Sequence, residues 1–108
     1  MYSDTDFQNI KDIIIKHIPT ASSVILFGSY ANGTAHEKSD LDILILLDKE
    51  LEWKERHNVL NRIYRESGQI GYHIDFLLKT KNNFENDRVL PTLSRVVARE
   101  GRVLWTRN

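Results

Sequence analysis

The stretch FGSYANGTAHEKSDLDILILL, residues 27–47, decides the fold, because it holds the ends of two predicted strands and the polar loop that joins them. An apolar run stops at Phe27, and Gly28 and Ser29 follow it, which predicts a strand that ends in a turn before a short helix. Free backbone N–H groups at such a helix end suit a phosphate. Ser29 is also a good helix N-cap residue, and the two roles are compatible.

Asp40 and Asp42 stand at the head of the second apolar run, Leu41 to Leu47. Side chains two residues apart on a strand leave the same face, so both carboxylates can share divalent cations. Aspartates are also common at turns and strand ends, where they need no catalytic role. Together with the Gly28–Ser29 turn, they favour a crevice in which a triphosphate and metal ions meet.

The remaining sequence predicts an α/β (α+β) fold with a mixed β-sheet and helices packed mainly on one face. Apolar residues at helical spacing predict three main helices, whereas β-branched and apolar runs predict strands. The expected helices cover residues 7–18, 52–67 and 91–100, with one extra turn at 29–33, and the expected strands cover 22–27, 41–47, 70–78 and 103–105. The polar segment 79–87 predicts a loop.

Local signals set the expected helix ends. Thr5-x-x-Gln8 is a possible capping box for the first helix. Gly68 stands where a C-terminal cap of the second helix is expected, and Pro91 suits the first position of the last helix. The apolar stripe expected on the second helix consists of Trp53, His57, Leu60, Ile63 and Tyr64.

Size and charge limit the possible functions. The 108 residues fit one domain, residues 1–108, without room for a separate substrate-binding domain, and the absence of cysteine excludes disulfides and thiolate metal sites. A formal net charge of zero lacks the basic field of proteins that hold nucleic acid by its phosphates, so a nucleic-acid partner is disfavoured. With no signal-like start and no long apolar run, we expect a soluble cytoplasmic protein without membrane contact.

Charge is unevenly distributed along the chain. Residues 1–78 carry 8 Lys and Arg against 12 Asp and Glu, whereas residues 79–108 carry 7 against 3, which gives −4 and +4. The basic residues Arg95, Arg99 and Arg102 are most simply the solvated side of the last helix. They could also meet an acidic partner or the nucleotide.

The spacing of Gly28-Ser29, ten residues, then Asp40-x-Asp42 resembles the signature of the DNA polymerase beta-like nucleotidyltransferase superfamily. In its length and in its ending REGRVLW, residues 99–105, the chain is similar to minimal nucleotidyltransferases, small prokaryotic proteins commonly paired with a HEPN-type protein as antitoxin and toxin. The resemblance implies that AMP is moved from ATP to a hydroxyl, with two Mg²⁺ ions in the active site.

The resemblance also implies a third aspartate, on a strand beside the Asp-x-Asp strand, that completes the metal site and helps deprotonate the attacking hydroxyl. Asp75 is the matching residue, so the expected metal and catalytic residues are Asp40, Asp42 and Asp75, with Gly28 and Ser29 binding the nucleotide. Asp75 interrupts an apolar strand, where burying an unpaired charge costs on the order of several kcal/mol. The alternative is a structural aspartate paired with an arginine or exposed at a sheet edge. His73 shares the expected face and could orient Asp75.

The chain departs from the family pattern at Tyr30 and Asn32, where members often carry arginines that hold phosphate. Lys38, His36 or a basic residue of the last thirty positions could replace them. Lys38 could equally be a solvated loop charge.

For the acceptor, the resemblance implies a tyrosine of a HEPN-type ribonuclease toxin, whose modification would block RNA cleavage. Two alternatives stay open: a non-catalytic antitoxin that neutralises its partner by binding alone, and a nucleotidyltransferase that acts on a small molecule. Relatives of the second kind have additional domain mass that this chain lacks.

Overall fold

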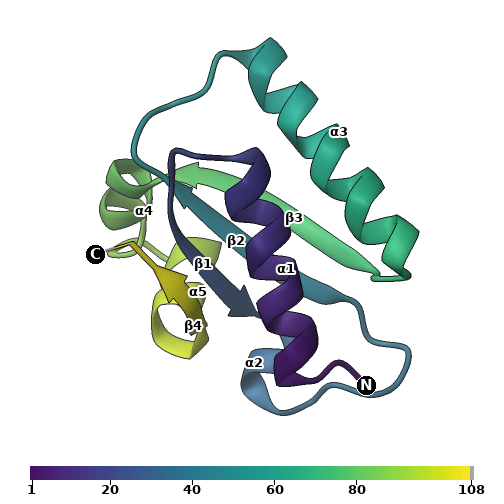
Figure 1. The fold of residues 1–108 in the computed structure, drawn as a ribbon. Coiled ribbons are helices and arrows are strands. Elements are labelled where there is room, and N and C mark those ends of the chain that lie inside the picture. Colours follow the sequence, from purple (N-terminus) through teal and green to yellow (C-terminus); the bar gives the residue numbers. More distant parts are fainter. Residues whose placement is uncertain (108) are drawn as a thin grey trace.

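A four-stranded mixed sheet lies at the centre of the structure, a computed structural model that describes residues 1–107. Its strand order is β3-β2-β1-β4. β1 is antiparallel to both of its neighbours, β2 and β4, whereas β2 and β3 are parallel (Figure 1). The strands are β1 Ala21–Phe27, β2 Leu41–Leu47, β3 Ile74–Thr80 and β4 Arg102–Thr106. The mixed sheet expected from the sequence is confirmed, including the final edge strand.

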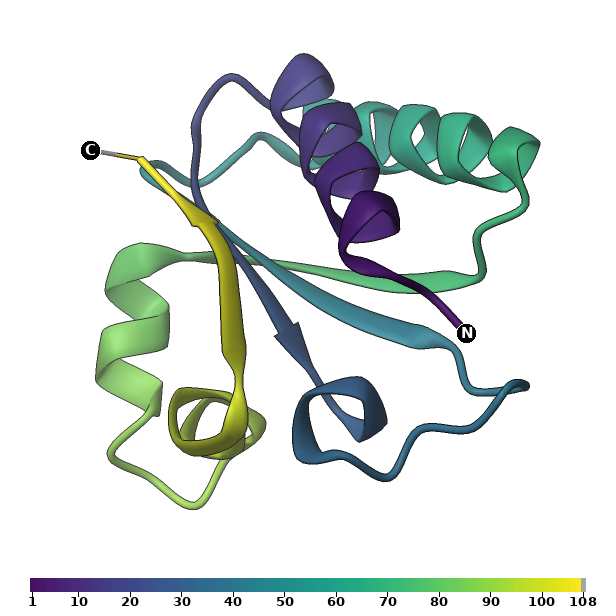
Figure 2. The same ribbon diagram turned by 60° about the horizontal axis from the view of Figure 1, so that its bottom comes forward.

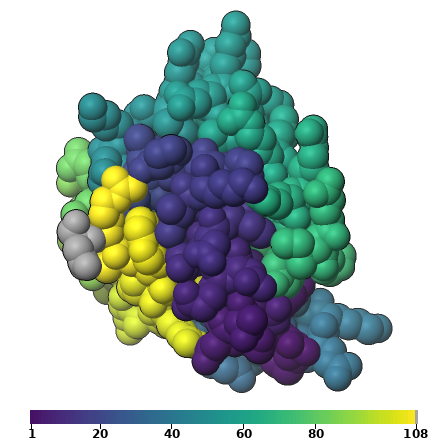
Figure 3. Space-filling model, viewed as in Figure 1, coloured from purple at the N-terminus to yellow at the C-terminus, as the bar shows by residue number. Residues whose placement is uncertain are grey.

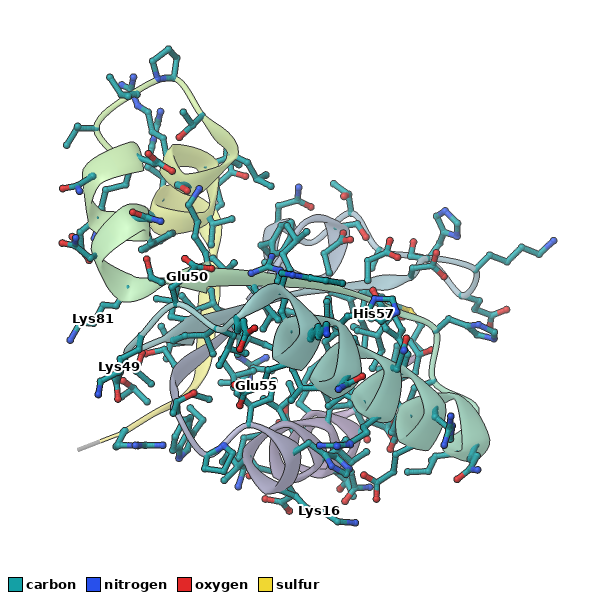
Figure 4. The ribbon with its side chains drawn as sticks, turned by 90° about the horizontal axis from the view of Figure 1, so that it is seen from above. Lys16, Lys49, Glu50, Glu55, His57 and Lys81 are labelled. Atoms are coloured by element: carbon teal, nitrogen blue, oxygen red, sulfur yellow. The ribbon has the colours of Figure 1, made fainter. Side chains whose placement is uncertain are left out.

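The two long helices, α1 (Asp4–His17) and α3 (Trp53–Ile70), cover one face of the sheet, and two short helices lie on the other (Figure 2). The short ones are α4 (Lys81–Asp87) and α5 (Leu93–Glu100). Viewed from above, β3 separates α3, which carries His57, from α4, which begins at Lys81 (Figure 4). Helices therefore pack mainly on one face, as predicted, while α4 and α5 add a smaller layer on the other.

Strand alternation divides the buried side chains between these two layers. Most of the core lies between the sheet and the long helices, and its fully buried members include Ile10, Ile14, Leu26, Ile43 and Ile45. A smaller cluster lies under the short helices and consists of Ile25, Phe27, Leu44, Leu46, Phe84 and Val97. Asp42 and Asp75 alternate along their strands with residues of the main core, so their side chains lie on the face of the sheet that carries this smaller cluster.

The first helix begins two residues before the predicted capping box. Ser3 is its N-cap: the Asp6 backbone N–H donates to the Ser3 hydroxyl, and the Ser3 backbone N–H donates to the Asp6 carboxylate at 2.8 Å. The Thr5-x-x-Gln8 expectation was wrong because the pair Ser3 and Asp6 has the same spacing and stands earlier. Figure 3 shows the α1 surface lying against the C-terminal strand β4, where Arg102 pairs with Asp4 at 3.2 Å.

Helix α3 runs further than predicted, through Gly68 to a cap at Gly71, whose φ of 102° is left-handed. The Gly71 backbone N–H donates to the Gly68 carbonyl at 3.0 Å, and the Tyr72 N–H donates to the Ser67 carbonyl. The expected cap at Gly68 was therefore wrong by three residues.

The face that α3 buries also differs from the predicted stripe. Ile63 is buried as expected and Leu60 is half-buried, but Trp53, at 70%, and Tyr64, at 42%, are exposed. The buried residues of α3 are Val59, Ile63 and Ser67. The Ser67 hydroxyl donates to the Ile63 carbonyl at 2.6 Å, so a small polar side chain can face the sheet without an unsatisfied group.

The segment predicted as a loop, residues 79–87, instead ends β3 and forms helix α4. Thr80 caps α4 by accepting a hydrogen bond from the Asn83 backbone N–H at 3.1 Å, and Phe84 anchors the helix in the smaller cluster. Helix α5 begins at Leu93 with Thr92 as its N-cap, so Pro91 precedes the helix and does not occupy its first position. None of the helices in residues 1–107 is long and apolar enough to cross a membrane.

Candidate active site

The turn after β1 has the predicted geometry. Gly28 takes φ 71° and ψ −150°, α2 spans Ser29–Asn32, and Gly33 closes it in the left-handed region. The Gly28 carbonyl accepts hydrogen bonds from the N–H groups of Ala31 and Asn32, both at 3.0 Å. Gly28 is the N-cap residue, so Ser29 is the first residue of the helix and the expectation of a Ser29 cap was wrong.

Gly28 touches the Asp-x-Asp segment directly. Phe27 and Asp42 are register partners on the antiparallel strands β1 and β2, which places the turn beside the first residues of β2. A Cβ built on Gly28 would overlap Oδ2 of Asp42. The backbone of the turn and the Asp42 carboxylate therefore form one surface, and a side chain at position 28 would force the carboxylate to move.

Asp42 and Asp75 lie side by side. They are register partners on the parallel strands β2 and β3, near the N-terminal end of each. Neighbouring strands are about 4.8 Å apart, so equivalent side chains leave the same face as close neighbours. Asp40 precedes β2 by one residue and is exposed. The structure thus brings two of the predicted carboxylates together at the Gly28 turn, with the third two residues away in the chain.

The electrostatics of Asp42 reflect this crowding. Burial first, and then the nearby Asp75 and Asp40 carboxylates, raises the pKa of Asp42 above its ordinary value. Like charges gathered in this way favour protonation unless a cation offsets them.

The donor set fits a divalent cation. Carboxylate oxygens are the ligands that Mg²⁺ prefers, and Mg²⁺ is usually held by one or two carboxylates, with water and substrate phosphates filling its other positions. Within residues 1–107, no three Asp, Glu, His or Cys side chains are already gathered around a common point. The in-register pair of Asp42 and Asp75 suits this two-carboxylate mode.

Asp75 was expected inside an apolar strand, where its burial would need a reason. The structure shows instead the placement that the alternative described, because β3 is an edge strand and Asp75 is exposed on it. Its register with Asp42, and not burial, is what links it to the site. His73 precedes β3, and its backbone N–H donates to the Tyr2 hydroxyl at 2.8 Å.

The two positions where arginines were expected serve the fold. The Tyr30 ring packs against those of Tyr2 and Phe7, with centroids 5.6 and 6.5 Å apart, and its hydroxyl is buried without a partner in the described residues. The Asn32 side chain accepts hydrogen bonds from the backbone N–H and the hydroxyl of Thr34. Neither contact involves the carboxylate side of the turn.

A hollow of about 330 Å³ lies next to Asp40 and was not predicted. Its walls come from the N-terminus, α2, the loop before β2 and the α3–β3 turn, and they include Tyr2, Tyr30, Lys38 and Tyr72. These segments are far apart in sequence, so no local pattern could have indicated it. The sequence signal for this hollow was limited to its three tyrosines, whose spacing follows no pattern.

A four-stranded mixed sheet with a Gly-Ser turn beside paired aspartates defines a nucleotidyltransferase-type domain. Residues 8–104 match the family described as the nucleotidyltransferase domain, and the chain belongs to that family. A Methanocaldococcus jannaschii protein, to which a protein adenylyltransferase activity is assigned by inference, is 34% identical over 82 residues, which are 76% of each chain. The family predicted from the sequence is confirmed.

Solved structures agree on the fold. A toxin–antitoxin crystal structure with AMP-PNP matches with a TM-score of 0.68 at 24% identity, over 95% of this chain and 75% of that one. A structure of a tri-AMPylated Shewanella oneidensis HEPN toxin in complex with an MNT antitoxin matches with a TM-score of 0.59 at 22% identity, over 94% of this chain and 70% of that one.

Proposed function

We propose that this nucleotidyltransferase moves AMP from ATP to a hydroxyl of a partner protein. The observation that carries the proposal is the in-register pair of Asp42 and Asp75 beside the Gly28 turn. Phosphate-binding backbone and metal-binding carboxylates then share one surface, which is what transfer from a nucleoside triphosphate requires. The relationship to a protein named as an adenylyltransferase supports AMP as the group that is moved.

The Gly28–Ser29 turn would hold the triphosphate. Its backbone N–H groups and the Ser29 hydroxyl can donate to phosphate oxygens, and the absence of a Cβ at Gly28 lets the chain approach closely. The acceptor oxygen would attack the α-phosphorus while the bond from that phosphorus to the bridging oxygen of pyrophosphate breaks. Holding the triphosphate in line for this displacement is the role of the turn.

Asp40, Asp42 and Asp75 would hold Mg²⁺, with two ions per site as the expected number. Bound there, the metal supplies charge stabilisation to the triphosphate and lowers the pKa of the acceptor hydroxyl. Asp75 is exposed on the edge strand β3, so it can reach an acceptor that arrives from solvent. We assign Asp75 the role of the base that takes the proton from the acceptor hydroxyl.

The proposed acceptor is a tyrosine of a HEPN-type toxin, which makes this chain its antitoxin. The structural neighbour in which an AMPylated HEPN toxin is bound to an MNT antitoxin supports the pairing. A tyrosine hydroxyl has an ordinary pKa of about 10 and needs activation to become a nucleophile at neutral pH. A protein acceptor also brings its own binding surface, so the nucleotidyltransferase domain itself need not supply all of it.

The proposal is tested by incubating the chain with a purified HEPN-type partner, ATP and Mg²⁺, followed by intact-mass spectrometry of both proteins. We expect the partner to gain one or more adenylyl groups and this chain to gain none. A partner whose mass stays unchanged while its ribonuclease activity is still suppressed would replace the proposal with neutralisation by binding alone. Transfer to a small molecule with no protein modified would replace it with the small-molecule alternative.

A further inference from the structure

The outer face of α5 exposes apolar side chains that a short surface helix would normally turn inward. Leu93 is 51% and Val96 48% exposed, and Leu77 on the adjoining β3 is 40% exposed. The helix already has its anchors, because Ser94 and Val97 face the sheet and are buried. Scattered exposed apolar residues need no explanation, but Leu93 and Val96 stand three residues apart and line the same hollow.

Two arginines frame these apolar side chains. Arg95 and Arg99 stand one turn apart on α5, and within residues 1–107 neither forms an ion pair. Other basic residues of this region are paired, for example Arg88 with Glu85 and Lys79 with Asp87. We call Leu77, Leu93, Arg95, Val96 and Arg99 the α5 surface.

Two adjoining hollows lie along the α5 surface, and Leu93 lines both. The outer hollow, about 590 Å³, is lined by Leu93, Arg95, Val96 and Arg99, and also by Glu100, its one acidic residue. The inner hollow, about 170 Å³, has Leu93 in its wall as well, together with Leu77.

Leu77 follows Asp75 by two residues on the same face of β3, so the two side chains are about 7 Å apart along the strand. The α5 surface and Asp75 therefore lie on the same face of the sheet, where Leu77 is the residue next to Asp75.

We propose that the α5 surface docks the protein acceptor, through a segment of that partner that presents apolar side chains flanked by carboxylates. The inference rests on the proposed function and adds the place where the acceptor binds. Charge complementarity argues for an acidic occupant, because residues 79–108 carry a net charge of +4 and the two arginines are unpaired in the described part of the chain. The hydrophobic side chains supply contact area, and the arginines supply orientation and a faster encounter.

The test compares two double variants of equal charge change. Arg95→Glu with Arg99→Glu reverses the α5 surface, whereas Arg62→Glu with Arg65→Glu reverses two exposed arginines of α3, on the opposite face of the sheet. Calorimetry with the purified HEPN-type partner measures docking, and calorimetry with a non-hydrolysable ATP analogue measures the nucleotide site. A third variant, Val96→Ser, tests the apolar contribution without a change in charge.

We expect the α5 double variant to weaken partner binding by about tenfold or more, as interfacial arginines do, and the α3 control to stay within about twofold of wild type. Val96→Ser should weaken partner binding as well. The KM for the partner should rise while kcat at saturation and the affinity for the ATP analogue stay unchanged.

Equal affinities of the two double variants for the partner would overturn the inference. A loss of ATP-analogue affinity in the α5 variant alone would also overturn it, because the arginines would then bind the nucleotide. A change in the self-association of this chain in the α5 variant, with partner binding intact, would assign the surface to a second copy. Partner binding that depends on the α5 surface without AMP transfer would contradict the proposed function and leave the docking inference standing. AMP transfer to the partner that is unaffected by the α5 variants would overturn the docking inference and leave the proposed function standing.

Discussion

Gly28 lies so close to the carboxylate of Asp42 that a Cβ at position 28 would overlap Oδ2. This contact joins the turn that ends β1 to the first residues of β2. It makes the position of Asp42 depend on the absence of a side chain in the turn that follows the neighbouring strand β1. Substitutions at glycine can therefore separate backbone strain from damage to the site.

Gly28→Ala and Gly33→Ala provide that separation. Both glycines have positive φ, 71° and 83°, so each alanine should cost about 1 to 3 kcal/mol of stability. Only Gly28→Ala should also displace Asp42 and lower AMP transfer, by about a hundredfold, because nothing lies within 4 Å of a Cβ at Gly33. Urea unfolding and transfer assays on both variants check this. Equal losses of activity would show that the Gly28 contact with Asp42 is unimportant.

Asp42→Asn should leave the metal-free fold at least as stable as wild type at neutral pH. Burial and the carboxylates of Asp75 and Asp40 raise the pKa of Asp42, so its charge opposes folding. A raised carboxyl pKa means that stability falls as pH rises from the ordinary value through the folded-state value, and asparagine removes that loss. Thermal unfolding with a chelator present measures the effect, and a variant clearly less stable than wild type would contradict it.

The corrected end of α3 predicts opposite outcomes for two glycines three residues apart. Gly68→Ala should raise stability by about 0.5 to 1 kcal/mol, since Gly68 lies inside the helix with nothing within 4 Å of an added Cβ. Gly71→Ala should lower it by about 1 to 2 kcal/mol, because Gly71 has a φ of 102°. Urea unfolding distinguishes the two, and a destabilising Gly68→Ala would return the cap to the position expected from the sequence.

Glu66 links α1 to α3 and gives the fold an acid-sensitive contact. Hydrogen bonds first from Lys16, at 2.8 Å, and then from His17, at 2.7 Å, lower the pKa of its carboxyl. The stabilisation is present above the ordinary glutamate pKa of about 4.3 and is lost as pH falls through the lowered folded-state value.

Glu66→Gln should therefore unfold at lower urea than wild type near neutral pH, with the difference shrinking at acidic pH. Glu55→Gln is the control on the same helix (Figure 4), since the ion pairs within residues 1–107 do not include Glu55. A Glu66 effect that does not change with pH would show that the contact is not electrostatic.

Predictions from the sequence were most accurate where the apolar pattern and the local turn residues indicate the same element boundary. The strand Leu41–Leu47 has the expected bounds because a run of apolar residues begins directly after Asp40, and the Gly28 turn follows from a glycine at the end of such a run. The helix ends were less secure. Gly68 and Gly71 are equally good caps by composition, and only the packing of Ser67 against the sheet side decides between them.

Tertiary pairing accounts for what could not be predicted. Helix α4 was missed because its two adjacent asparagines indicate a loop, while the Phe84 anchor gains its energy from the distant residues Leu44 and Leu46. The partnership of Asp42 with Asp75 depends on the register of two strands separated by α3, which no local spacing encodes. Tyr30 likewise acquires its role from Tyr2 and Phe7 of another part of the chain.

The central claim is tested most directly by the rate of AMP transfer to the HEPN-type partner. The variants are Asp42→Asn and Asp75→Asn, and each is compared with Asp12→Asn. Asp12 is an exposed carboxylate of α1 that pairs with Lys11, so its loss controls for a change of charge alone. The account predicts that both site variants lose at least about a hundredfold in rate under single-turnover conditions while they remain folded, and that Asp12→Asn matches wild type. Transfer within about tenfold of wild type by either Asp42→Asn or Asp75→Asn would contradict it, because the paired carboxylates would then not carry the chemistry.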